Sequence, residues 1–259
     1  MRPHAERRSN AEGQGAPAGC WAACAQIYEC AANRVFYQAA MDRLLQGAPA
    51  LRGRGLDLGC GTGFSTEVLV AKCPDVAWEG ADASASMLAV ARRKSCLQGV
   101  GFREAKAEAL PYADASFDVV VASFAWHWFA EQAGQEVRRV LRPGGWLLAS
   151  VPVRRRSSAS GNRLLARALL SGRRRFRKRT SQGLSPDALA RLLTPPVWVA
   201  RHEVLVEREC FADERRMMEA LTSRGALVAL FGDHPPTALD ASGPIEYEWP
   251  YGVLHVQTR

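Results

Sequence analysis

A glycine-rich segment with the sequence DLGCGTG, residues 57–63, stands between a predicted strand and a predicted helix. Its glycines at 59, 61 and 63 permit a tight turn and let a ligand approach the backbone without meeting a Cβ atom. The N–H groups that are freed where the helix begins can meet a carboxylate. The segment therefore predicts a ligand-binding loop, although a turn that serves structure alone gives the same pattern.

A carboxylate stands at a matching position one strand further along the chain. Asp82 ends the next predicted strand, 19 residues after Gly63. An acid at that place can accept hydrogen bonds from both hydroxyls of a ribose. The loop and Asp82 together indicate a cofactor that contains a ribose.

The elements that must position these residues alternate between strands and helices, a pattern that predicts βαβ units and a parallel sheet. Ser84 can cap one of the helices, because its hydroxyl can accept a bond from an orphan N–H. The predicted strands span 54–58, 76–82, 100–104, 117–124 and 146–153, and the predicted helices span 26–47, 64–73, 84–96 and 131–141.

This regularity is lost after residue 153. Residues 154–196 contain the arginine runs 154–156 and 173–179, and we interpret them as a basic lid insertion over the ligand-binding edge of the sheet. Further helices are predicted at 164–171, 185–193 and 213–229, and further strands at 197–209 and 246–257.

Composition limits the class of protein. The chain has 259 residues, of which 47% are hydrophobic, and a formal net charge of +8, as expected for a soluble globular protein with a basic surface. We expect residues 1–25 to form a disordered arm, residues 26–259 to form one domain, and the protein to be cytoplasmic without a membrane span. The seven scattered cysteines predict reduced thiols rather than a disulfide framework, and no metal site is expected.

Four segments in consecutive order carry a resemblance to a known family. They read LDLGCGTG, GADASASML, AEALPYADASFDVVVASFAWHW and EVRRVLRPGGWLLAS, and they lie within residues 51–152. Together they resemble the class I S-adenosylmethionine-dependent methyltransferases, especially the group that acts on small molecules. The resemblance implies an α/β, Rossmann-like fold: a mostly parallel seven-stranded sheet with helices on both faces and a helical lid insertion.

The resemblance also implies S-adenosyl-L-methionine as the cofactor. In this family the glycine loop holds the methionine part, the acid ending the second strand takes the ribose, and its neighbours flank the adenine. Ser123 would face the sulfonium. Carried over position by position, the family pattern predicts a cofactor site composed of Asp57, Gly59, Cys60, Gly61, Asp82, Ala83, Met87, Ala107, Glu108 and Ser123.

One position departs from the family pattern. Family members commonly have an aspartate before Ala-Glu-x-Leu-Pro, and it binds the adenine amino group. Lys106 stands there in this chain, and lysine cannot accept a hydrogen bond. That contact is therefore missing or replaced by a backbone carbonyl, which could weaken cofactor affinity by about 1 kcal/mol.

The acceptor is suggested by a looser resemblance. The segments SFAWHWF, FADERRMMEALTSRGA and PIEYEWPYGVLHV resemble malonyl-[acyl-carrier protein] O-methyltransferase of biotin synthesis, with His127 where that family has Gln. Acyl carrier proteins are acidic, so an arginine patch would steer them. The expected partner is therefore a small-molecule acceptor or an acidic acyl carrier protein rather than a nucleic acid.

The candidate catalytic and acceptor residues follow from the reaction. A carboxylate acceptor needs no general base, whereas a phenol or carbon acid needs one, and His127 is the candidate. Equally, His127 can form an aromatic wall with Trp126 and Trp128. Arg224 could hold a carboxylate or be a surface arginine. Tyr28, Trp126 and Trp128 could line the acceptor site or pack in the core.

Three further readings stay open. A quinone-like or natural-product acceptor would be methylated at carbon or oxygen. The basic charge suggests a nucleic-acid methyltransferase, but Ser123-Phe124-Ala125-Trp126 stands where many amino-methylating enzymes have an N-P-P-Y-type tetrad, and no RNA-binding module is recognisable. Lys106 raises the possibility of a fold that binds its ligand without catalysis.

Overall fold

The computed structural model describes residues 25, 28–153, 157–171, 197–224, 238–239 and 241–258. The predicted arm at 1–25 lies almost entirely outside the described residues. So do the helix expected at 185–193 and most of the expected lid insertion at 154–196. No helix among the described residues is long and apolar enough to cross a membrane.

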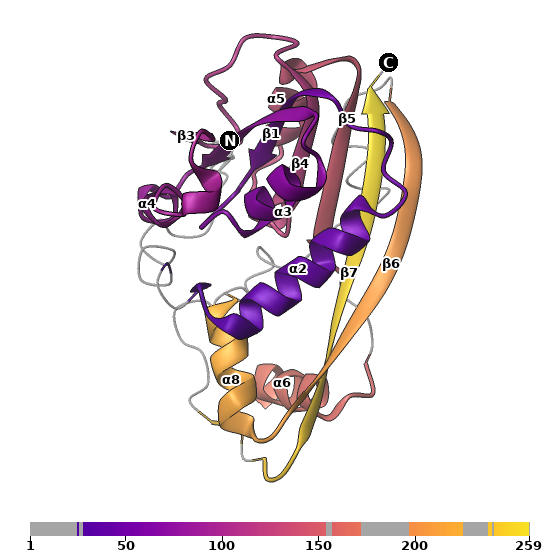
Figure 1. Cartoon of the computed structure of the whole chain (residues 1–259). Helices are drawn as coiled ribbons and strands as arrows, with labels where there is room; N and C mark the ends of the chain where they lie inside the picture. Colours follow the sequence, from indigo (N-terminus) through magenta and orange to yellow (C-terminus); the bar gives the residue numbers. More distant parts are fainter. Residues whose placement is uncertain are drawn as a thin grey trace, which may run out of the picture.

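A seven-stranded sheet organises the chain (Figure 1). Its strand order is β3-β2-β1-β4-β5-β7-β6, and β7 alone runs antiparallel to its neighbours β5 and β6. The sequence therefore predicted the mostly parallel sheet correctly. The strands are β1 Gly53–Leu58, β2 Val76–Asp82, β3 Gly101–Glu104, β4 Phe117–Ser123, β5 Leu141–Pro152, β6 Val197–Phe211 and β7 Ile245–Thr258.

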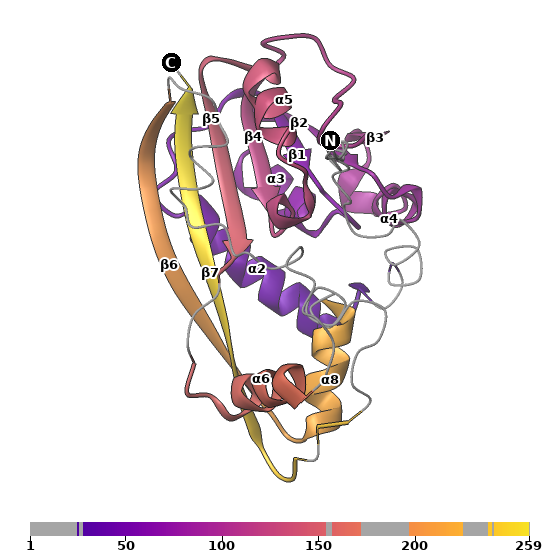
Figure 2. The ribbon, with the colours of Figure 1, turned by 180° about the vertical axis from the view of Figure 1, so that it is seen from behind.

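Helices cover both faces of this sheet, and each face has its own hydrophobic core. On one face Met41 and Leu69, from α2 and α3, are completely buried. On the other, Val137 of α5 packs with Leu147 of β5. Figures 1 and 2 show these faces from opposite sides. The helices are α2 Ala31–Leu45, α3 Phe64–Lys72, α4 Ala85–Ala91, α5 Ala133–Val140, α6 Ser160–Ser171 and α8 Glu214–Ser223, with short 3-10 turns at Ser95–Leu97 and Trp126–Trp128.

Helix α4 ends earlier than predicted. The sequence indicated one helix over 84–96, but α4 stops at Ala91, and a 3-10 turn follows at Ser95–Leu97. The N–H groups of Arg93 and Lys94 donate to carbonyls three residues earlier, which tightens the last turn. The break turns Lys94 back toward two carboxylates on other elements, Glu29 and Glu67. The predicted Ser84 cap is confirmed, because its hydroxyl accepts from the Met87 N–H at 3.4 Å.

The last two strands extend beyond the rest of the sheet. Pairing of β7 with β5 ends at Tyr251, whereas its pairing with β6 continues to Ile245. On the open side of this ribbon, Asn162 replaces the missing strand, since its side chain donates to the Glu248 carbonyl at 3.0 Å and accepts from the Glu248 N–H at 2.8 Å. We call α6, α8 and ribbon residues 206–211 and 245–250 the cap (Figure 2).

The cap has a small hydrophobic core of its own. Leu165 of α6, Met217 and Leu221 of α8, and Ile245 and Tyr247 of β7 are buried together. The cap is therefore a separate packing unit at the end of the sheet where β4 and β5 finish, which is the end that carries the glycine loop.

Candidate functional site

The glycine loop has the geometry that its sequence predicts. Gly59, Gly61 and Gly63 all have positive φ, at 73°, 54° and 88°, where residues with a Cβ atom are strained. A Cβ on Gly59 would also lie 2.4 Å from the Cβ of Ala125. All three positions therefore favour glycine for backbone conformation, and Gly59 requires it also for the close approach of the loop after β4.

The N–H groups of residues 59–61 in this loop all have acceptors within the protein. Those of Gly59 and Cys60 both donate to the Ala81 carbonyl, at 2.7 and 3.1 Å. That of Gly61 donates to Asp82 Oδ2 at 2.9 Å. These three donors hold the loop against β2 and are not free for a ligand. The sequence prediction concerned the N–H groups where α3 begins, and it stays a prediction. The pairing of β1 with β2 brings the acceptors into reach, which the sequence alone does not show.

Asp82 is the centre of the predicted ribose site. Besides the Gly61 N–H, its carboxylate accepts from the Ser84 N–H at 2.8 Å. Burial raises its pKa, and the two backbone hydrogen bonds oppose that shift. An ionised carboxylate has about four acceptor positions, so two remain for the hydroxyls of a ribose. Ala83, beside it, is exposed.

Asp57 carries an unused acceptor beside the loop. Its Oδ2 accepts from the hydroxyls of Ser65 and Thr66, at 2.7 and 2.6 Å. Its Oδ1 and the hydroxyl of Thr62 are buried, and neither has a hydrogen-bond partner among the described residues. Burial raises the pKa of Asp57 to about 6, against these hydrogen bonds. The unpaired Oδ1 of Asp57 and the unpaired hydroxyl of Thr62 fit the methionine part of the cofactor, whose ammonium and carboxylate groups would pair with them.

The predicted adenine side is formed by the beginning of α4. Met87 is buried and packs with Ala25, and Tyr28 and Val90 pack against them. The Cys60 side chain instead points toward β2, because a Cβ on Gly80 would lie 3.0 Å from its sulfur. Cys60 therefore offers its backbone, and not its thiol, to a ligand. Tyr28, predicted as an acceptor residue, packs against this predicted adenine side and also stacks on Tyr37 at 5.3 Å between ring centroids.

The segment after β3 fixes a neighbouring loop. Lys106 is exposed and Ala107 is buried. Glu108 accepts from the Ala130 N–H at 2.5 Å, so its carboxylate anchors the loop that follows β4. Ser123, at the end of β4, lies within hydrogen-bond distance of the Ser150 hydroxyl, at 3.3 Å.

The loop after β4 begins with a strained residue. Phe124 has a φ of +50°, which is rare for a non-glycine residue and is concentrated at functional sites. The turn sends its ring into a cluster with Phe36, Tyr37 and Tyr251, at centroid distances of 5.4, 5.8 and 5.2 Å. The sequence pattern did not single out Phe124 or the α2 residues Phe36 and Tyr37. The available signal was the pair of adjacent aromatic residues in a predicted helix.

His127 lies in the 3-10 turn of this loop. Part of the residue reaches the surface, but its Nδ1 atom is enclosed and has no hydrogen-bond partner among the described residues. Burial lowers its pKa to about 3. Its ring lies 4.8 Å from that of Trp128, whereas Trp126 is 2% exposed and belongs to the core. The aromatic-wall reading therefore fits His127 and Trp128 but not Trp126.

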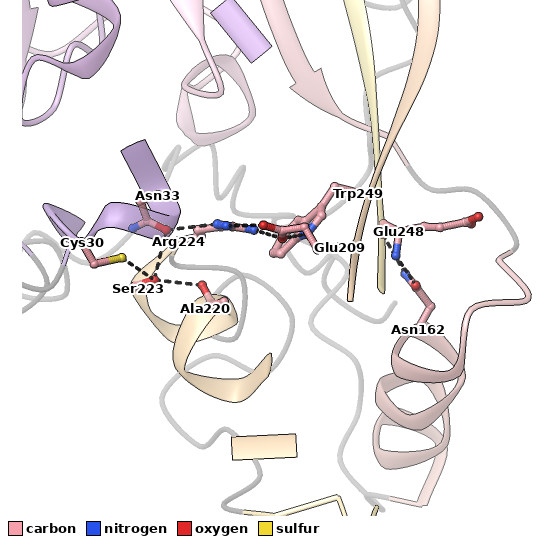
Figure 3. Close-up of polar contacts among 9 residues, drawn as sticks. All are labelled: Cys30, Asn33, Asn162, Glu209, Ala220, Ser223, Arg224, Glu248 and Trp249. Atoms are coloured by element: carbon pink, nitrogen blue, oxygen red, sulfur yellow. Dashed lines mark hydrogen bonds and ion pairs between the residues drawn. The ribbon is translucent and has the colours of Figure 1, made fainter. Parts of the chain in front are cut away.

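Arg224 is a buried residue, so its reading as a surface arginine is wrong (Figure 3). Its guanidinium pairs with both carboxylate oxygens of Glu209, one at 2.9 Å, and its Nε donates to Asn33 Oδ1 at 3.0 Å. The group stacks on Phe36 and Trp249, at 4.4 and 4.7 Å from the ring centroids. Trp249 also donates to Glu209, at 2.6 Å. This network joins α2, α8 and the β6–β7 ribbon.

The fold and this arrangement define a class of protein: an α/β domain whose predicted cofactor-binding residues lie at the carboxyl ends of parallel strands. Residues 56–149 match the family described as a methyltransferase domain. This part of the chain is therefore similar to methyltransferase domains, and S-adenosylmethionine is the methyl donor that this similarity implies.

Individual proteins support the same assignment. The chain is 44% identical to a demethylmenaquinone methyltransferase of Thermus thermophilus over 42% of its own length and 50% of the relative's. It is 40% identical to a malonyl-[acyl-carrier protein] O-methyltransferase of Methylococcus capsulatus over 38% of its length and 36% of the relative's. Thus the chain matches half or less of each relative, and the two relatives differ in their named acceptors.

The fold agrees with solved structures over a larger part of the chain. The YcgJ protein from Bacillus subtilis superposes with a TM-score of 0.58 and 21% identity, covering 86% of this chain and 99% of that one. At this identity the likeness establishes the fold alone. No group of three or more potential metal-binding side chains occurs among the described residues.

Proposed function

We propose that the protein is an S-adenosylmethionine-dependent methyltransferase whose acceptor is a small molecule or a carrier-bound acid, with malonyl-acyl carrier protein as the first candidate. The Asp82 carboxylate carries the cofactor assignment, because it holds the glycine loop and still has acceptor positions for a ribose. The match of residues 56–149 to a methyltransferase domain supports it independently.

Methyl transfer requires the protein mainly to align the acceptor with the methyl group. The bound cofactor supplies a methyl group already activated by its sulfonium. The chain's residues bind that cofactor from one side, with Asp82 at the ribose and Asp57 and Thr62 at the methionine part. They must then hold a nucleophile in line with the methyl group, a contribution of proximity and orientation.

The pKa values of the side chains on the proposed acceptor side favour an acceptor that needs no general base. The pKa of His127 lies near 3, so its ring is a neutral and very weak base at pH 7. Burial raises the pKa of Tyr28 and of Tyr37, so neither phenol ionises near neutral pH. A carboxylate is already anionic and reacts without proton removal, which is why we favour O-methylation of a carboxylate.

A quinone-like acceptor is the second candidate. The rings of Phe36, Tyr37 and Phe124 support it, because flat rings stack favourably on aromatic side chains. The name of the Thermus relative points the same way. This candidate would require a general base or an already ionised acceptor.

The test is methyl transfer from labelled S-adenosylmethionine to malonyl-acyl carrier protein, with the unmalonylated carrier as control and a reduced demethylmenaquinone as competitor. We expect label on the malonyl carrier alone, and a His127→Gln variant within about threefold of the wild type. A loss of 100-fold or more in that variant is the size expected for a general base and would support the quinone-like acceptor. Cofactor binding without turnover on any acceptor would support a non-catalytic fold.

A further inference from the structure

Four charged side chains surround the ring of Phe64, the first residue of α3. Lys94 Nζ lies 2.9 Å from Glu29 and 2.5 Å from Glu67. Arg34 lies 2.7 Å from Glu67 and 3.6 Å from Glu29. Both cations also approach the Phe64 ring, at 4.4 Å for Lys94 and 4.9 Å for Arg34. We call Glu29, Arg34, Glu67 and Lys94 the ion cluster.

The ion cluster joins three separate segments of the chain. Lys94 follows α4, Glu67 lies in α3, Glu29 lies just before α2, and Arg34 lies in the first turn of α2. The side chains of Lys94 and Glu67 are only 12% and 17% exposed, so solvent screens their attraction less than that of a surface pair. Two positive and two negative charges make the cluster neutral.

The segment that the cluster holds lies across the cofactor site. Residues 28–34, here the strap, place the Tyr28 ring 6.0 Å from that of Phe64 and against Met87 on α4. Asn33 fixes the strap internally, since its side chain donates to the Tyr28 carbonyl at 2.9 Å. The glycine loop leads into Phe64 and Asp82 leads into α4, so the strap bridges the two walls between which the cofactor binds.

We propose that the ion cluster is a latch that holds the strap closed over the cofactor and sets the rate at which the cofactor is exchanged. This proposal rests on the proposed function, because it takes the site between α3 and α4 to bind S-adenosylmethionine. Glu29 and Arg34 move with the strap, whereas Lys94 and Glu67 stay with the walls. Opening the strap must separate Glu29 from Lys94 and Arg34 from Glu67.

The test compares the rate of S-adenosylhomocysteine release in three variants, measured by displacement in a stopped-flow instrument with tryptophan fluorescence. Glu29→Gln removes the strap's carboxylate, and Lys94→Met removes the wall's cation while keeping most of its apolar volume. Asp42→Asn is the matched control, since Asp42 and Lys72 form a 2.5 Å pair between the same helices α2 and α3, away from the strap.

We expect release to be about fivefold faster in Glu29→Gln and in Lys94→Met, the size of one weakened ion pair, and unchanged in Asp42→Asn. Raising the salt concentration should speed release in the wild type and have a smaller effect in Lys94→Met. Equal release rates in all four proteins would overturn the latch alone. Failure of the wild type to bind S-adenosylhomocysteine would overturn the proposed function, and the latch with it.

Discussion

The cofactor half, which we define as residues 51–152, and the cap are held together by different kinds of contacts. In residues 51–152, apolar strands and a glycine loop pack against helices that are near them in the sequence. The polar side chains of the predicted site, Asp57 and Asp82, lie at the carboxyl ends of β1 and β2. In the cap, Arg224 is buried against Glu209, Asn33 and Trp249, residues that come from three distant parts of the chain. The predicted cofactor site thus depends on local pattern, and the cap, which we propose as the acceptor side, depends on pairing between separate segments.

This difference has a functional consequence. A loop between a strand and a helix can bind the same cofactor in many proteins, because its geometry is carried by a few adjacent residues. The acceptor side can change with the cap while the cofactor half stays the same. The two relatives with different named acceptors match this chain over half of its length or less, which agrees with that division.

Replacing the cap's buried cation should have the largest effect on stability. Arg224→Met leaves the Glu209 carboxylate, which is 27% exposed, without its main partner, and breaking such a pair should cost about 3 kcal/mol of unfolding free energy. Urea unfolding measures this, with Arg215→Met, exposed on the same helix, as control. We expect S-adenosylhomocysteine affinity to change less than about threefold, and a larger loss would mean that the two regions are coupled.

The matching change in the cofactor half is Asp82→Ala. It removes the acceptor of the Gly61 and Ser84 N–H groups and the proposed ribose ligand. We expect the affinity for S-adenosylhomocysteine to fall about 100-fold, equivalent to about 2.7 kcal/mol, by isothermal titration. Asp75→Ala, on the exposed turn before β2, should bind like the wild type. Unchanged binding in Asp82→Ala would remove Asp82 from the site.

Cofactor affinity should depend on pH through Asp57. Its pKa is raised from 3.8 to about 6 in the free protein, so the ionised form that pairs with the cofactor's ammonium is lost as pH falls through 6. We expect about a tenfold weaker affinity for S-adenosylhomocysteine at pH 5 than at pH 7. In Asp57→Asn the affinity should be low and nearly flat over this range, and a wild-type-like slope in that variant would assign the titration to another group.

The same raised pKa has an opposite effect on folding. Because the folded protein binds a proton to Asp57 more tightly than the unfolded chain does, the contribution of Asp57 to stability decreases as pH rises from about 4 to about 6. Bound cofactor should cancel this decrease, since it favours the ionised carboxylate. Thermal unfolding with and without S-adenosylhomocysteine at pH 5 and pH 7 separates the two effects.

The smallest predicted change in stability concerns Asn162, on the open side of the β6–β7 ribbon. Asn162→Ala removes both hydrogen bonds to the Glu248 backbone, at a cost of about 1 kcal/mol in unfolding free energy. Arg163→Ala, at the next position on α6 and exposed, is the matched control. A value near zero for Asn162→Ala would mean that water replaces the side chain, so that α6 is held by its apolar face alone.

The sequence predicted the sheet and the cofactor loop because their signals are local. Continuous apolar runs mark strands covered on both faces, and the three loop glycines mark positive φ, which the structure has at each of them. The order of elements then limited the topology to a parallel sheet, whose carboxyl ends bring Asp57 and Asp82 to one edge.

Tertiary structure alone decided which groups those residues meet. The donors of the glycine loop bind Ala81 and Asp82 because β1 and β2 pair in a particular register. Arg224 is buried and Lys94 joins the ion cluster because segments about 190 and 65 residues away fold back onto them. The residues that flank an arginine or a lysine do not identify its partner in the folded protein. The partner is decided by packing, whose energy is summed over the whole fold. The sequence by itself therefore determined the cofactor half, and the three-dimensional structure decided the acceptor side and the strap.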